Sequence, residues 1–227
     1  MTYLIRLFYA AATLAMKIAL LMLADWQVVG AENVPRSGPL VVVANHQNLI
    51  DPPLISASLP RRVSFMAKQE LFKVPVLGAF IFLYGSILVR RGDVDRKAIR
   101  AARRVLSSGG VLGMFPEGHR SATAELQPAR AGAAYIASGA GVPLLPIGIT
   151  GTNVVKGISW VLRRPRIRVV IGQTFSLPQK EGRPTSRDLM AMTDEIMLRI
   201  AALLPEDVHG AYRGRSVDSS QTVKDRI

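Results

Sequence analysis

Short apolar runs alternate with helix-like segments along most of this chain, and this alternation constrains its fold more than any other feature. The clearest runs are Leu-Val-Val-Val-Ala at 40–44, Val-Leu-Gly-Met-Phe at 111–115 and Pro-Leu-Leu-Pro-Ile-Gly-Ile at 143–149. Apolar runs of this length, bounded by turn residues, are typical of strands buried on both faces. Strands that alternate with helices predict an α/β domain with a mixed, mainly parallel sheet flanked by helices.

The same patterns predict the remaining elements. Further strands are expected at 62–67, 85–91 and 166–171, and helices after Asp51 and at 96–108, 128–138 and 186–204. Residues 69–84 read as a helix broken by Pro75 and Gly78. Because the chain has 227 residues and shows no internal repeat or long linker, we expect one domain at 27–204. The polar residues 205–227 are expected to form a flexible tail.

The N-terminal segment differs from an ordinary soluble segment. It is apolar from Tyr3 to Ala24 except for Arg6 and Lys17, which lie close to three helical turns apart and so share a helix face. The apolar runs between these cations are too short to span a bilayer. We therefore expect residues 1–26 to form a helix at the membrane interface, with the two cations reaching the head groups and Trp26 near the boundary. A tilted span, a signal peptide and a buried core helix are the alternatives.

Charge and composition narrow the choice of partners. The 29 Lys and Arg residues exceed the 16 Asp and Glu residues, which gives a net charge of +13 and favours anionic membrane lipids or nucleic acid. Aromatic residues make up only 6% of the chain, and no strand alternates aromatic with basic residues, so we expect no nucleic acid. Because the chain has no cysteine and only three scattered histidines, we expect neither thiol chemistry nor a metal site.

His46 and Asp51 are the strongest candidates for chemistry in this sequence. His46 follows the strand expected at 40–44, and Asp51 precedes a Pro-Pro pair that suits the first turn of a helix. A carboxylate can hold one imidazole nitrogen protonated while the other nitrogen takes a proton from a hydroxyl. Because no Ser, Cys or Thr nucleophile motif stands beside them, the pair favours direct attack by a substrate hydroxyl. The alternative is a hydrogen-bonded pair that only shapes the loop.

Two further polar groups are expected near this pair. Arg91 ends a predicted strand, and Glu117 follows one, as His46 does. Binding sites in α/β sheets gather at the carboxyl ends of strands. The sequence therefore predicts that the three side chains belong to one site.

Four ordered blocks of this sequence resemble those of the glycerophospholipid acyltransferase family, over about residues 25–175. They read Asn-His-Gln-Asn-Leu-Ile-Asp-Pro at 45–52, Gly-Ser-Ile-Leu-Val-Arg-Arg at 85–91, Phe-Pro-Glu-Gly-His-Arg-Ser at 115–121 and Val-Pro-Leu-Leu-Pro at 142–146. The resemblance implies that 27–204 is an acyltransferase domain. It also implies that His46 is the catalytic base, that Asp51 orients it, and that backbone N–H groups at the start of the helix after His46 stabilise the oxyanion.

The resemblance implies roles for the other blocks as well. Arg91 and Arg120 are expected to bind the acceptor phosphate, since a guanidinium can bind it bidentately. Glu117, with Gly118, is expected to hold the acceptor; the alternative is that Glu117 pairs internally with one of the arginines. We expect Lys68 to add positive charge for the phosphate, with an exposed lysine as the alternative.

The reaction implied is transfer of a fatty acyl group from acyl-CoA or acyl-carrier protein to the sn-2 hydroxyl of lysophosphatidic acid (1-acylglycerol 3-phosphate), giving phosphatidic acid. No cofactor is expected besides this co-substrate. The expected location is the cytoplasmic face of the cell membrane. Alternatives are another acceptor (glycerol 3-phosphate, another lysophospholipid or a lyso-aminolipid), or a non-catalytic basic protein that binds membranes or nucleic acid.

Two positions depart from the family pattern. Position 119 is His where the family usually has Thr, and position 90 is Arg where an acidic residue is common. His119 either contacts the acceptor phosphate or takes the place of a loop hydroxyl. Arg90 adds positive charge where a phosphate is expected. Both departures bear on the acceptor more than on the reaction.

Overall fold

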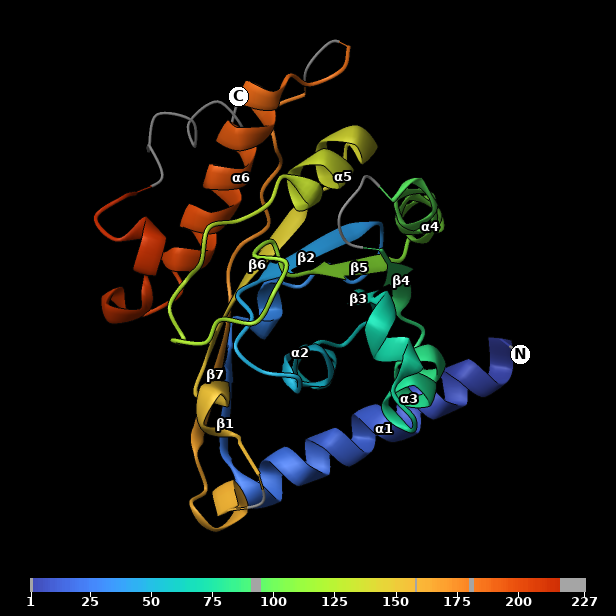
Figure 1. Ribbon diagram of the computed structural model, residues 1–227, viewed down its shortest axis with the longest axis vertical. Coiled ribbons are helices and arrows are strands. Elements are labelled where there is room, and N and C mark those ends of the chain that lie inside the picture. Colours follow the sequence, from blue (N-terminus) through green and yellow to red (C-terminus); the bar gives the residue numbers. More distant parts are fainter. Residues whose placement is uncertain (1, 91–94, 158, 180–181, 217–227) are drawn as a thin grey trace.

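A seven-stranded sheet with helices on both faces forms the body of the protein (Figure 1). The computed structural model describes residues 2–90, 95–157, 159–179 and 182–216. The strand order is β1-β7-β6-β2-β5-β3-β4, and neighbouring strands are parallel except for the antiparallel pair β6 and β7. This confirms the predicted mixed, mainly parallel α/β fold. The strands are β1 (Asp25–Val29), β2 (Leu40–Ala44), β3 (Val63–Lys68), β4 (Ile87–Val89), β5 (Val111–Met114), β6 (Leu144–Thr150) and β7 (Arg166–Ile171).

The α-helices lie close to their expected positions. The segment expected to be a broken helix is a 3-10 turn, Gln69–Lys73, followed by a short α-helix. The break falls at Val76, which adopts a positive φ of 64° directly after Pro75. The α-helices are α1 (Thr2–Leu23), α2 (Asp51–Ser58), α3 (Leu77–Leu83), α4 (Arg96–Ser107), α5 (Gly132–Ala140) and α6 (Ser186–Ala201).

The sheet separates two apolar cores. All five side chains of β2 are fully buried, and they alternate between the two faces. Val41 and Val43 join the core beneath α4, α5 and α6, whereas Leu40, Val42 and Ala44 join the core beneath α1 and α2. Burial of such a side chain stabilises the fold by about 1.5–3 kcal/mol. This double burial holds the carboxyl end of β2 in place.

The edge strand β1 was not predicted. It follows α1 directly and pairs in parallel with β7. Its side chains alternate between exposed and half-buried, so it lacks the continuous apolar run that marks the central strands. Trp26, which we expected near the membrane boundary, is half-buried in this strand.

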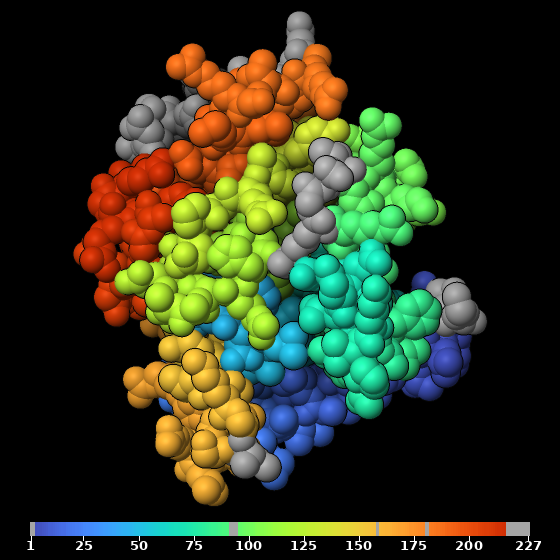
Figure 2. Space-filling model, viewed as in Figure 1, coloured from blue at the N-terminus to red at the C-terminus, as the bar shows by residue number. Residues whose placement is uncertain are grey.

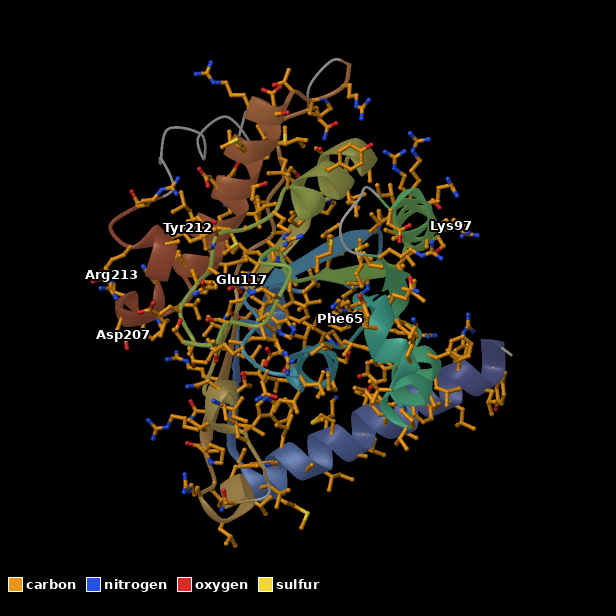
Figure 3. The ribbon with its side chains drawn as sticks, viewed as in Figure 1. Phe65, Lys97, Glu117, Asp207, Tyr212 and Arg213 are labelled. Atoms are coloured by element: carbon orange, nitrogen blue, oxygen red, sulfur yellow. The ribbon has the colours of Figure 1, made fainter. Side chains whose placement is uncertain are left out.

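Part of the expected flexible tail is ordered against the body. Within 205–216, the N–H of Leu126 donates to the carbonyl of Val208, and the hydroxyl of Tyr212 accepts from the N–H of Ala129. Tyr212 is 4% exposed and points inwards (Figure 3). A single aromatic residue in a polar stretch thus anchors these residues, while residues 217–227 lie outside the described part.

Candidate active site

His46 and Asp51 lie at the carboxyl end of β2, as the sequence predicted. The Nδ1 atom of His46 is 2.8 Å from Oδ2 of Asp51. The His46 side chain is 16% exposed and that of Asp51 is fully buried. Within the described chain, Nε2 of His46 has no hydrogen-bond partner, so it is available to a substrate hydroxyl. The pair therefore has the geometry of a general base and its orienting carboxylate.

Asp51 begins α2 and organises the loop that carries His46. Its Oδ2 also accepts the backbone N–H groups of Gln47 and Asn48, each at 2.7 Å. A carboxylate at a helix start is also favourable because it lies at the positive end of the helix dipole. These two N–H groups are thus occupied. Both precede α2, so the expectation that N–H groups at the start of that helix stabilise an oxyanion stays a prediction.

Asp51 holds the imidazole at its Nδ1 edge, and aromatic rings pack on the face of the imidazole. The ring of Phe115 stacks on His46 with centroids 4.0 Å apart, and Phe65 stacks on Phe115 at 5.7 Å. Gly113 makes room for this stack, because a Cβ there would lie 2.4 Å from the Phe65 ring. The sequence analysis missed the role of Phe115. Its place as the last residue of the expected strand was the only available signal.

Two asparagines tie the His46 loop to its neighbours. The side-chain amide of Asn45 donates to the carbonyl of Ile149 and accepts its N–H, both at 2.8 Å, and so extends the pairing of β2 with β6. Asn48 donates to the carbonyls of Thr152 and Val155. These bonds anchor the loop to β6 and to the chain after it, on both sides of His46. They therefore hold the backbone that carries the imidazole in place.

Glu117 fastens the loop after β5 to the His46 loop. Its Oε1 accepts the N–H of His46 at 2.8 Å, and its Oε2 accepts the N–H of Gln127 at 2.9 Å. The residue is 1% exposed and lies near the middle of the molecule (Figure 3). Both carboxyl oxygens therefore bond to the protein backbone. Neither expected alternative, contact with the acceptor or pairing with an arginine, describes these bonds.

Burial raises the pKa of Glu117 to about 7, against the lowering effect of its two backbone hydrogen bonds, and the nearby Asp51 charge raises it further. A carboxyl whose pKa is raised by folding favours the folded state most below about pH 4.5, and that contribution is lost as the pH rises through 7. We expect the wild type to lose about 3 kcal/mol of unfolding free energy relative to Glu117→Gln between these limits. Urea denaturation across pH measures this difference.

The matched control for this experiment is Glu206→Gln, which removes an exposed carboxyl. Its unfolding free energy should follow that of the wild type across the pH range. Parallel curves for the wild type and Glu117→Gln would contradict the assignment of a proton to the buried carboxyl.

Lys68, Gly118 and Arg120 lie at the same edge of the sheet, with different surroundings. Lys68, the last residue of β3, is partly exposed and 3.4 Å from Glu70. Gly118 adopts a positive φ of 73° in the turn after β5, and Arg120 is exposed two residues further on. Arg91 lies outside the described residues.

Three nearby side chains complete this edge. Arg90 is exposed and donates to the side chain of Gln69 at 2.9 Å. His119 is also exposed, and its ring contacts only the carbonyl of Arg120 within the described part of the chain. Arg130, which no sequence pattern indicated, lies beside Gly118. The loop that carries these last residues, drawn in yellow-green, covers the centre of one face of the molecule (Figure 2).

Comparisons with known proteins agree with this arrangement. The model of the Acyltransferase family matches residues 25–150. The 1-acyl-sn-glycerol-3-phosphate acyltransferase of Bacillus subtilis is 27% identical over 190 residues, which cover 83% of this chain and 93% of that protein. A Chlamydomonas reinhardtii protein of the same name is 30% identical over 81% of this chain, but the match spans only 54% of its length.

A solved structure shares the fold. The crystal structure of the 1-acyl-sn-glycerophosphate (LPA) acyltransferase PlsC from Thermotoga maritima matches with a TM-score of 0.65 and 24% sequence identity. The match covers 96% of this chain and 83% of that one. At this identity the likeness establishes the architecture, including the N-terminal part of the chain.

Proposed function

Because this chain belongs to the acyltransferase family, we propose that it transfers an acyl group from a thioester to the sn-2 hydroxyl of lysophosphatidic acid, giving phosphatidic acid. The observation that carries the proposal is the His46–Asp51 pair, with Nδ1 held at 2.8 Å and Nε2 unbonded in the described structure. The matched family model includes both residues. Acyl-CoA and acyl-carrier protein are the two candidate donors.

The pair supports direct attack by the substrate hydroxyl, without a covalent enzyme intermediate. Nε2 of His46 takes the hydroxyl proton as the substrate oxygen attacks the thioester carbonyl. The tetrahedral intermediate then collapses, the carbon–sulfur bond breaks, and the departing thiolate takes the proton from the imidazolium. Asp51 stabilises the positive charge of the imidazolium through its bond to Nδ1. The products are an ester and a free thiol, and His46 returns to its neutral form.

The phosphate of the acceptor would bind the cations at the same edge of the sheet. Arg120 and Lys68 lie at this edge and would supply this charge, together with Arg91. Arg90 and Arg130 are further candidates because both are exposed near this edge. Several guanidinium groups around one phosphate would select an anionic acceptor over a neutral monoacylglycerol.

A panel of acceptors tests the proposal directly. Purified protein is incubated with acyl-CoA or acylated carrier protein and with lysophosphatidic acid, glycerol 3-phosphate, other lysophospholipids or a lyso-aminolipid. Mass spectrometry should detect phosphatidic acid as the main product, made from at least one donor. Transfer to another acceptor alone would replace lysophosphatidic acid as the proposed acceptor. Transfer to none of them would overturn the proposed reaction.

We further propose that α1 contacts an anionic membrane. Of the helices in the described structure, it alone is long and apolar enough to cross a bilayer, and only 11% of its 18-residue apolar window is buried. The helix lies on the outside of the layer formed with α2 and α3 (Figure 1). Large apolar side chains cover its free face: Tyr3, Leu4, Leu7, Leu14, Ile18, Leu21 and Met22. Such a face suits a helix lying in the interface.

The full chain should sediment with phosphatidylglycerol vesicles, and protein left in the supernatant would exclude this contact.

A further inference from the structure

An open, largely apolar cavity with cations on its wall lies at the opposite edge of the sheet from His46. It has a volume of about 280 Å³ and is bordered by α1, the end of α2 and the segment before β3. β3 runs parallel to β5, so the residues before it lie at the amino edge, whereas His46 and Glu117 lie at the carboxyl edge. Its lining includes Tyr9, Ala10, Leu14, Lys17, Arg61 and Arg62. The cavity is therefore separate from the candidate active site.

This cavity is cationic without any compensating acid. Lys17, Arg61 and Arg62 line it, and among the described residues no Asp or Glu does. Arg61 uses its guanidinium to bind the carbonyls of Pro35 and Gly109, among others, so it is committed to the fold. Lys17 is half-buried and has no ion-pair partner within the described chain. Two of the three positive charges are thus left for a ligand.

Arg62 is held in place but incompletely bonded. Its guanidinium carbon lies 5.0 Å from the centre of the Tyr9 ring, which supports it by a cation–π contact. On another side it touches Gly85, where a Cβ would come within 2.3 Å of Nη2. Its Nε atom is buried and has no hydrogen-bond partner in the part of the chain described. A buried, unbonded donor on a fixed cation is costly unless an anion or water completes it.

The mouth of the cavity is continuous with the apolar face of α1. Ala10 and Leu14 both line the cavity and are exposed on that face, and Leu14 is 59% exposed. Lys17 follows one turn after Leu14 on the same side of the helix. A molecule in the cavity would therefore meet cations inside and apolar side chains at the mouth. This combination matches a lipid, whose phosphate is anionic and whose chains are apolar.

We infer that this cavity binds the phosphate of an anionic glycerophospholipid of the bilayer, with Lys17 and Arg62 as the contacting cations. The acyl chains of the lipid would lie along the exposed face of α1. The site would fix the position of α1 on the membrane surface rather than supply a substrate. The inference rests on the proposed membrane contact of α1 and is independent of the proposed reaction.

Lys17→Gln tests the site, with Arg6→Gln as its matched control. Both changes remove one cation from the same flank of α1, but Arg6 does not line the cavity. Native mass spectrometry in neutral detergent measures the Kd for phosphatidylglycerol. We expect Lys17→Gln to raise this Kd about tenfold, as for loss of one hydrogen bond to a charged group, and Arg6→Gln to leave it unchanged. Arg62→Gln should act like Lys17→Gln while its circular dichroism stays that of the wild type.

Two further probes identify the ligand. Diacylglycerol, which has no phosphate, should not be retained, and excess inorganic phosphate should not displace phosphatidylglycerol. Equal losses in Lys17→Gln and Arg6→Gln, retention of diacylglycerol, or displacement by inorganic phosphate would each overturn the lipid site. Acyl transfer is measured on the same samples. Because Lys17 lies outside the candidate active site, its variant should keep the wild-type rate, so failure of the lipid site is separable from failure of the reaction.

Discussion

His46→Ala should lower kcat for acyl transfer by about 10³–10⁴-fold, because the variant has no group that can take the hydroxyl proton. KM for lysophosphatidic acid should change little, since His46 acts on the reacting hydroxyl and not on the phosphate. Steady-state kinetics with the donor and acceptor found in the acceptor panel measure both constants. Added imidazole should restore part of the rate by entering the space left beside Phe115.

The matched control is His119→Ala, which removes an exposed imidazole from the neighbouring loop. Its kcat should stay within a few-fold of the wild type. A rise in its KM would assign His119 to the acceptor phosphate, and an unchanged KM would favour the loop role. A His46→Ala enzyme that retains the wild-type kcat would exclude His46 as the base.

Asp51→Asn should lower kcat by about 10³-fold, because an amide cannot stabilise the imidazolium by charge. The variant should also be less stable, since Oδ2 of Asp51 accepts three hydrogen bonds in a fully buried position. We expect a loss of about 1–3 kcal/mol in unfolding free energy. Kinetics and urea denaturation of the same preparation separate the two effects, because a purely structural role would lower the active fraction without changing kcat per folded molecule.

Asp188→Asn provides the control for this variant. Asp188 also lies at a helix start, where it accepts the N–H of Thr185 in the capping box of α6. Its replacement should cost a comparable or smaller amount of stability, with no change in kcat. If Asp51→Asn lost stability but kept its kcat, the orienting role of Asp51 would be excluded.

The sequence alone predicted most of the architecture. The fully buried runs of β2, β5 and β6 and the helices α2, α4, α5 and α6 were predicted to within a few residues. Their apolar patterns are local, and burial on both faces of a sheet leaves a continuous signature. β1 was not predicted, because an edge strand lacks that signature. The packing of residues 205–216 was not predicted either, because Tyr212 is their single buried residue.

The candidate site was predicted only in part. The sequence determined that His46 and Asp51 stand at a strand end, because their spacing and the Pro-Pro pair are local features. The tertiary structure decided the rest, because the contacts join residues far apart in the chain. These are the stacking of Phe115 on His46, the bridge from Glu117 to the N–H groups of His46 and Gln127, and the cationic cavity between α1 and β3. Such contacts depend on which strands become neighbours, and only the folded sheet fixes that order.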